Sequence, residues 1–279
     1  MSDWLTQLIQ QEQLPEAYRD TVETVARPLA TMILERRPRL IGLCGAQGSG
    51  KSTLTQVLAR LIEAEGLSIA TLSLDDLYLT RAARLALARD VHPLFATRGV
   101  PATHDVALGL EVLGQLGAGG DTQLPRFDKS IDDRAASGPK VSGPVDMVLL
   151  EGWCVGAAPL PDFPEPINDL ERLEDPDGVW RRASATALAG PYQALFGQIG
   201  FLVLLAAPGF EVVRSWRQEQ EAKLRARAGK GMSDAEVVRF IQHYERLTRW
   251  ILEEMPGRAD VVVDLDAIRT AGIRPPTRR

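Results

Sequence analysis

The sequence has little cysteine and no long hydrophobic run, and both absences limit what the protein can be. Its two cysteines, Cys44 and Cys154, are too few for a disulfide framework, and both flank apolar segments, as small buried side chains do. No apolar run reaches the length of a membrane span, so we expect no membrane partner. Residues 1–19 are polar and partly acidic, unlike a signal peptide. The sequence therefore predicts a cytoplasmic protein.

The chain also lacks an excess of basic residues. Its 5 lysines and 27 arginines stand against 37 acidic residues, which gives a formal net charge of −5. Domains that bind nucleic acid are usually strongly basic, so we expect no nucleic-acid partner. With 279 residues and 45% hydrophobic content, the chain can bury a full core as one large domain with insertions.

One segment has a composition that is rare elsewhere in the chain. Residues 45–52 read Gly-Ala-Gln-Gly-Ser-Gly-Lys-Ser and fit the phosphate-binding loop (P-loop) G-x-x-x-x-G-K-[ST]. Its glycines leave room for backbone N–H groups to surround phosphate oxygens. Lys51 is expected to reach the β- and γ-phosphates, and the Ser52 hydroxyl to ligate Mg²⁺. The predicted nucleotide-binding residues are Gly45, Ala46, Gln47, Gly48, Ser49, Gly50, Lys51, Ser52 and Thr53.

Apolar segments alternate with helical patterns along the chain. The predicted strands are residues 39–44, 68–74, 145–150, 201–206 and 260–265, and the predicted helices between them are residues 53–65, 103–116 and 210–227. This alternation predicts an α/β fold with a doubly wound, mostly parallel five-stranded sheet flanked by helices. With the P-loop, the pattern indicates a three-layer P-loop NTPase fold. Ligands of such sheets bind beyond the carboxyl ends of the strands.

The remaining segments divide into regions of different character. We expect residues 1–38 to form N-terminal helices packed on the core, and residues 39–279 to form the P-loop domain. Within that domain, residues 80–144 are candidate substrate loops, residues 156–183 an insertion, and residues 210–232 a lid. Long segments outside regular structure in a compact domain are usually functional or disordered.

Carboxylates follow two of the predicted strands. Asp75 is our candidate general base or metal ligand, and Asp76 would support the metal, the substrate or the geometry; the alternative for the pair is a helix cap. Glu151 follows the third strand, where an acidic side chain would help to hold Mg²⁺. The predicted metal ligands are therefore Ser52, Asp75 and Glu151.

Polar side chains in the candidate substrate loops form two further groups. Arg98 is suited to forking onto a carboxylate, while His104 and Asp105 have either substrate or structural roles, the latter as a helix cap. Lys129 and Arg134 are candidate anchors for an anionic substrate, or members of a solvated charged loop. Tyr78 completes the predicted substrate-binding set. In the lid, Arg214 or Arg217 would supply positive charge to the transferring phosphoryl group, unless the helix is simply solvated.

Together these stretches resemble the phosphoribulokinase/uridine kinase group of P-loop kinases and, within it, the D-glycerate 3-kinase family. The matching stretches are residues 45–52, SLDDLYLT at 73–80, RGVPATHD at 98–105, FDKSIDDR at 127–134, EGWCVG at 151–156 and SWRQEQEAKL at 215–224. The chain departs from the family pattern at Ala102, where Gly is usual, and at Leu77, where Phe is usual. Neither departure touches a reacting group.

The resemblance implies phosphoryl transfer from ATP to D-glycerate, with Mg²⁺ as cofactor, Asp75 as base, and Arg98 or Arg134 holding the substrate carboxylate near His104. Alternatives are a kinase of another small acceptor (uridine, pantothenate or a pentose phosphate) and a non-catalytic nucleotide switch or assembly factor. A nucleoside acceptor would call for aromatic stacking residues, whereas Arg98, Lys129 and Arg134 favour an anionic acceptor. These motifs specify no oligomeric state.

Overall fold

The fold is built on a six-stranded sheet. The computed structural model describes residues 3–162, 165–228 and 231–275. The strands lie in the order β10-β9-β8-β1-β7-β2, with β1 at Leu40–Gly45, β2 at Ile69–Ser73, β7 at Met147–Gly152, β8 at Phe201–Ala206, β9 at Val261–Leu265 and β10 at Ala271–Ile273. All pairs are parallel except β9 with β10. The five predicted strands are present, and β10 adds an antiparallel edge that the sequence did not predict.

Strand side chains alternate between two cores, one on each face of the sheet. Ile41 and Leu43 of β1 point into one core, and Leu40 and Cys44 into the other. This alternation is the period of two that a pleated strand imposes. Because both faces are covered, β1 and β8 are buried along their whole length, and so they are continuous hydrophobic runs in the sequence.

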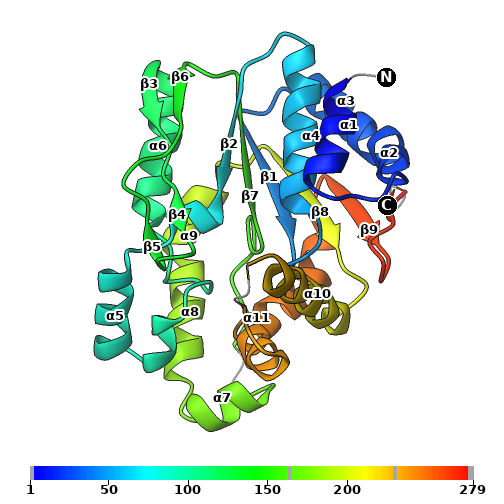
Figure 1. Ribbon diagram of the computed structural model, residues 1–279. Helices are drawn as coiled ribbons and strands as arrows, with labels where there is room; N and C mark the ends of the chain where they lie inside the picture. The colour runs from blue at the N-terminus through cyan, green and yellow to red at the C-terminus, as the bar shows by residue number, and fades with distance from the viewer. Residues whose placement is uncertain (1–2, 163–164, 229–230, 276–279) are drawn as a thin grey trace.

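Helices cover both faces of the sheet and complete the three layers (Figure 1). The first core contains α1 (Asp3–Gln11), the continuous helical segment of α2 (Tyr18–Thr21), η1 (Val22–Ala26) and α3 (Arg27–Arg36), α4 (Lys51–Ala64) and the start of α10 (Phe210–Ala228). The second contains α6 (Val106–Ala118), α8 (Val179–Ala189), α9 (Pro191–Phe196) and much of α11 (Asp234–Glu254). Val22, Leu29 and Ile33 are fully buried, so residues 1–38 include part of the main core.

The segments beyond the carboxyl ends of the strands form the lower part of Figure 1. They include η2 (Leu74–Leu77), α5 (Arg81–Asp90), η3 (Pro93–Ala96), α7 (Asp169–Glu174) and the antiparallel pair β4 (Phe127–Asp128) with β5 (Asp133–Arg134). A second antiparallel pair, β3 (Gly120–Gln123) with β6 (Lys140–Gly143), lies in the upper part of Figure 1, and η4 (Met255–Gly257) precedes β9. Leu170 and Trp180 pack with Leu94, Phe95 and Val100. The predicted insertion therefore packs on the candidate substrate loops.

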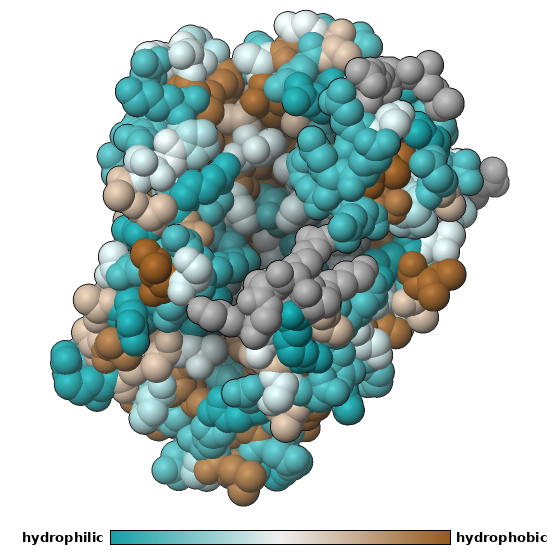
Figure 2. All heavy atoms as spheres, viewed as in Figure 1, coloured by the Kyte–Doolittle hydropathy of each residue, from teal (hydrophilic) through white to brown (hydrophobic). Residues whose placement is uncertain are grey.

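The face of the molecule that is turned to the viewer in Figure 1 carries mainly hydrophilic residues (Figure 2). In the described part of the chain, no helix combines the length and the apolar character needed to cross a bilayer. The predicted insertion and lid also include residues 163–164 and 229–230, which lie outside the described residues.

Candidate active site

The P-loop connects the buried strand β1 to α4. Gly50 is the N-cap of α4 and has φ +89°, a left-handed conformation that glycine adopts without strain. The Lys51 ammonium donates a hydrogen bond to the Ala46 carbonyl at 3.1 Å, which folds the lysine back over the loop. Because backbone N–H groups at a helix N-terminus attract anions, this turn is suited to phosphate.

A cavity of about 330 Å³ opens over the P-loop. Its lining residues are Glu12, Gln47, Gly48, Gly50, Lys51, Ser52, Thr53, Asp75, Tyr78, Arg98, Lys129, Glu151, Gly152, Trp153, Arg217, Gln220, Phe240 and Tyr244. The Gln47 Oε1 atom is buried and has no hydrogen-bond partner among the described residues. A Cβ placed on Gly50 would meet no atom within 4 Å, so the loop leaves open space there. These features fit the triphosphate of a nucleotide. Of the predicted nucleotide-binding residues, Gly45, Ala46 and Ser49 are buried and are not among the lining residues.

Asp75 lies in the cavity at the carboxyl end of β2. The Ser73 side chain caps η2 by accepting a hydrogen bond from the Asp75 amide at 3.3 Å. The carboxylate accepts hydrogen bonds from the Tyr78 hydroxyl at 2.8 Å and from the Lys129 ammonium at 2.7 Å. Burial raises the pKa of Asp75, but Lys129 and Tyr78 outweigh this and hold the pKa at about 2. The carboxylate is therefore ionised at neutral pH.

Glu151 lies opposite the first turn of α4. One of its carboxylate oxygens accepts hydrogen bonds from Ser73 Oγ at 2.9 Å and from Ser52 Oγ at 3.3 Å. No group of three His, Cys, Asp or Glu side chains able to hold a metal occurs in the described ranges. Mg²⁺ in phosphoryl-transfer sites is held by one or two protein ligands together with substrate phosphates and waters. The Ser52–Glu151 pair fits that kind of partial site.

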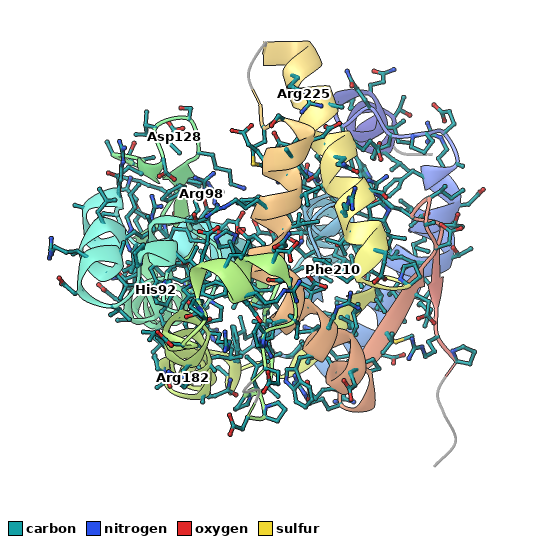
Figure 3. All side chains as sticks on the ribbon, turned by 90° about the horizontal axis from the view of Figure 1, so that it is seen from below. His92, Arg98, Asp128, Arg182, Phe210 and Arg225 are labelled. Carbon is teal, nitrogen blue, oxygen red and sulfur yellow. The ribbon has the colours of Figure 1, made fainter. Side chains whose placement is uncertain are left out.

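Arg98 lines the cavity and is held through its backbone. The Tyr244 hydroxyl donates to the Arg98 carbonyl at 3.0 Å, and the Trp153 indole N–H donates to the Gly99 carbonyl at 2.8 Å. The guanidinium forms an ion pair with Asp132 and lies 5.5 Å from the Phe127 ring centroid. Figure 3 shows Arg98 on the side of the substrate loops, facing the α10–α11 hairpin.

A buried arginine links the candidate substrate loops to one another. Arg84 is 1% exposed and donates to the Ala96 carbonyl at 2.8 Å and to the Asp132 carbonyl at 2.6 Å. Its guanidinium also lies 2.9 Å from the Asp132 carboxylate. Since Asp132 pairs with Arg98 as well, α5, η3 and the β4–β5 hairpin reach the cavity as one linked unit.

Four of the predicted substrate-binding residues are absent from the cavity lining. Asp76 pairs with Arg126 and accepts from the Phe127 amide, and burial raises its pKa. His104 is buried with Nδ1 2.6 Å from the Tyr192 hydroxyl, and burial lowers its pKa to about 4.

The other two, Asp105 and Arg134, pair with each other at 2.8 Å. Asp105 also accepts from the Leu108 amide as the N-cap of α6, the capping role that the sequence left open. Burial opposes ionisation of Asp105, but the hydrogen bond from Arg134 outweighs it and lowers the pKa. Tyr78, Arg98 and Lys129 are the members of the predicted set that line the cavity.

The two candidate lid arginines occupy different positions on α10. Arg217 lines the cavity, with its guanidinium carbon 5.1 Å from the Phe240 ring centroid and an ion pair to Glu221. Arg214 is exposed and is not among the lining residues. Of the two candidate arginines on α10, Arg217 is therefore the one that approaches the cavity.

Some lining residues were not predicted from the sequence. Phe240 and Tyr244 belong to α11, which the strand–helix pattern did not include. A capping box at its start, Ser233 with Glu236, is the signal that could have revealed this helix. Glu12 from the N-terminal region and Gln220 from α10 also line the cavity; no motif includes Glu12, whereas Gln220 lies in the matched stretch 215–224 but was not singled out.

Known proteins of similar sequence and structure identify the family of this chain. No model of a protein family matches the chain. Uncharacterized kinase mug58 of Schizosaccharomyces pombe is 37% identical over 229 residues, which cover 75% of this chain and 79% of that protein. The chain belongs to the glycerate 3-kinase-like family of P-loop kinases. As the resemblance implied, this family combines the P-loop fold with ATP-dependent kinase activity on a small-molecule substrate.

Two further members of the glycerate 3-kinase-like family have an activity in their names. The chloroplastic D-glycerate 3-kinase of Arabidopsis thaliana is 33% identical over 220 residues, covering 74% of this chain and 46% of that one. The structure of D-glycerate 3-kinase from Cryptococcus neoformans matches with a TM-score of 0.70 and 27% identity, covering 89% and 98%. Because the plant relative is chloroplastic, the cytoplasmic location stays a prediction for this kinase, as does the absence of a nucleic-acid partner.

Proposed function

We propose that this kinase transfers the γ-phosphoryl group of ATP to D-glycerate and forms 3-phosphoglycerate. One observation carries the proposal: Asp75 lies in the P-loop cavity together with two cations, Lys129 and Arg98, that come from the substrate loops. The carboxylate suits the attacking hydroxyl, and the two cations suit the carboxylate of a small hydroxy acid. The names of the plant and fungal relatives support the same acceptor.

The aromatic residues of the cavity support a small anionic acceptor over a nucleoside. Tyr78, Trp153 and Tyr244 are only 4%, 4% and 3% exposed, so little ring surface is free for stacking on a base. Tyr78 stacks on His104, and Tyr244 meets Trp153 edge-on. The most exposed of the four lining rings, Phe240, is covered by the Arg217 guanidinium. The described lining residues therefore offer a uridine acceptor little free ring surface for stacking.

Asp75, Lys51 and Arg217 have separate roles in the phosphoryl transfer. Asp75 holds the acceptor hydroxyl and takes its proton as the hydroxyl oxygen bonds to the γ-phosphorus and the bond to the β–γ bridging oxygen breaks. Before the acceptor binds, Lys129 and Tyr78 hold the pKa of Asp75 at about 2, so the carboxylate is ionised and able to accept the proton. Lys51 and Arg217 stabilise the charge on the transferring group and on the departing ADP oxygen.

We assign the metal position to Ser52 and Glu151. These two side chains would hold Mg²⁺, which would supply positive charge to offset the negative charge of the nucleotide phosphates. Asp75 was also predicted as a metal ligand, but its carboxylate is already bonded to Lys129 and Tyr78. We therefore assign Asp75 the role of general base, and Ser52 and Glu151 the role of Mg²⁺ ligands.

An acceptor screen tests the proposal. ATP consumption would be measured with D-glycerate, L-glycerate, uridine, pantothenate and a pentose phosphate, and the product hydroxyl assigned by phosphorus NMR. We expect the highest kcat/KM with D-glycerate and a product phosphorylated at the 3-position. A higher kcat/KM with any other acceptor would overturn the assignment. Tight ATP binding with no transfer to any acceptor would support the nucleotide switch instead.

A further inference from the structure

Arg269 joins the P-loop to the lid helix α10. It lies in the turn between β9 and β10, and its Nε donates to the Gly48 carbonyl at 2.7 Å. Its Nη2 lies 2.8 Å from the Glu219 carboxylate, and its guanidinium carbon lies 5.2 Å from the Trp216 ring centroid. One side chain therefore contacts the nucleotide-binding loop and two residues of α10.

The turn that presents Arg269 is held in a strained conformation. Arg269 has φ +69°, which is costly for a residue with a side chain. The Asp266 carboxylate accepts from the amides of Ile268 at 2.9 Å and Thr270 at 2.7 Å, and these bonds hold the turn on both sides of Arg269. The Trp216 indole donates to the Ala267 carbonyl at 2.8 Å and ties the turn to α10. Strain that is retained by so many contacts points to a functional position.

The Gly48–Ser49 peptide is fixed from both of its ends. Arg269 holds its carbonyl, and its N–H donates to the Ala46 carbonyl at 3.2 Å. A Cβ on Gly48 would lie 2.7 Å from Trp216 Cβ, so α10 packs directly on the loop. Without Arg269, this glycine peptide at φ +79° could rotate and turn its carbonyl oxygen toward the phosphate site. That oxygen would repel the phosphate oxygens that backbone N–H groups should bind.

We propose that Arg269 is a positioning residue that sets the affinity for ATP by holding Gly48 in its phosphate-binding conformation. Because Arg269 also pairs with Glu219 of α10, its contact with Gly48 depends on the position of that helix. The lid and the P-loop therefore adopt their binding conformations together. The inference concerns the nucleotide half of the site and does not depend on which acceptor the kinase uses.

The test is nucleotide affinity measured without any acceptor. Binding of a fluorescent N-methylanthraniloyl ATP would be compared in the wild type and in Arg269→Met. We expect the Kd to rise about tenfold, as the loss of one charge-assisted hydrogen bond implies. The KM of the acceptor at saturating ATP should stay within about twofold, because the contacts of Arg269 with the described residues are to the P-loop and α10. The matched control is Arg274→Met, which removes an arginine paired with Asp264 on the same hairpin and should leave the Kd unchanged.

Two more variants separate positioning from a general loss of stability. Glu219→Gln should raise the Kd by about threefold, and adding it to Arg269→Met should give no further increase, since both act through the same guanidinium. If Arg269→Met does not fold, Arg269→Lys serves in its place, because lysine keeps the charge but lacks the planar guanidinium whose Nε and Nη2 reach Gly48 and Glu219 separately. The proposal would be overturned if the folded Arg269 variant bound the nucleotide with the wild-type Kd. It would also be overturned if Arg274→Met raised the Kd as much as the Arg269 variant.

Discussion

Lys129 and Asp75 are 54 residues apart in the sequence, and the lysine ammonium donates to the aspartate carboxylate at 2.7 Å. The contact connects the β4–β5 loop to the end of β2. It also means that our candidate base and one of our candidate substrate anchors neutralise each other in this structure. An acceptor carboxylate would draw Lys129 away, which would free the Asp75 oxygen for the hydroxyl.

Asp75→Asn should remove most of the turnover and leave ATP binding intact. The amide keeps the shape of the side chain but cannot take a proton, so we expect kcat to fall about a thousandfold. Asp76→Asn is the matched control, and its kcat should fall by less than about tenfold because Asp76 bonds to Arg126 and Phe127 outside the cavity. A larger loss in the Asp76 variant would transfer the role of base to that residue.

Lys129→Met should shift the acid limb of the pH profile of kcat/KM to higher pH. Asp75 must be ionised to act as base, so activity falls as the pH drops through its pKa. With the pKa at about 2, the wild type shows no acid limb from this group in the working range. In the variant, burial raises the pKa without the opposing charge, and the limb of kcat/KM should move up by at least about one pH unit. Lys140→Met, on exposed β6, should keep the wild-type profile; if its limb also moves, the assignment to Asp75 fails.

Arg217 and Arg214 should differ in their effect on phosphoryl transfer. Arg217 lines the cavity, so Arg217→Met should lower kcat by about a hundredfold through the loss of charge on the transferring group. Arg214→Met should change kcat by less than about twofold, because that side chain is exposed on α10. Steady-state kinetics at saturating ATP and acceptor measure both. The reverse order of effects would place Arg214 at the phosphoryl group when the lid closes.

Glu151→Gln should raise the Mg²⁺ concentration needed for half-maximal activity. The substitution removes the negative charge that would attract the ion, while the amide can still bond to Ser52 and Ser73. We expect a shift of about tenfold in a Mg²⁺ titration at fixed ATP, with much of the activity recovered at high Mg²⁺. An unchanged titration midpoint would show that Glu151 only orients the two serines.

Ala102→Gly should stabilise the protein. Ala102 has φ +82°, in the left-handed region that disfavours a Cβ, and glycine removes this strain. We expect the free energy of unfolding to rise by about 1 kcal/mol in denaturant titration. The same substitution in a helix is the control: Ala86→Gly in α5 should lower it by about 0.5–1 kcal/mol. A decrease for both variants would mean that the Arg98–Asp105 turn tolerates alanine without strain.

The parts of the fold that the sequence predicted are those with strong local signals. β1 and β8 are uninterrupted apolar runs, and the P-loop has both a fixed spacing and a strand before it. β10 has only three residues and is stabilised by pairing with β9 and by the ion pair of Arg274 with Asp264, which are non-local contacts. No period of two can develop over three residues, so the sixth strand could not be predicted.

The catalytic half of the site was more predictable than the acceptor half. Asp75 and Glu151 follow parallel strands, and the sheet topology brings such residues to one edge. Whether an arginine or histidine in a loop faces a ligand or another side chain depends on tertiary contacts. Arg134 and His104 have the same residue types as a substrate site would require, yet they contact Asp105 and Tyr192.

Arg84 has a consequence for any attempt to graft a new acceptor preference onto this kinase. Its buried guanidinium is shared between carbonyl oxygens on two different loops and one carboxylate, that of Asp132. Exchanging either loop alone would leave a desolvated charge without its partners, which costs several kcal/mol. To keep the protein folded, a loop exchange must therefore replace the whole segment from residue 79 to residue 134 at once.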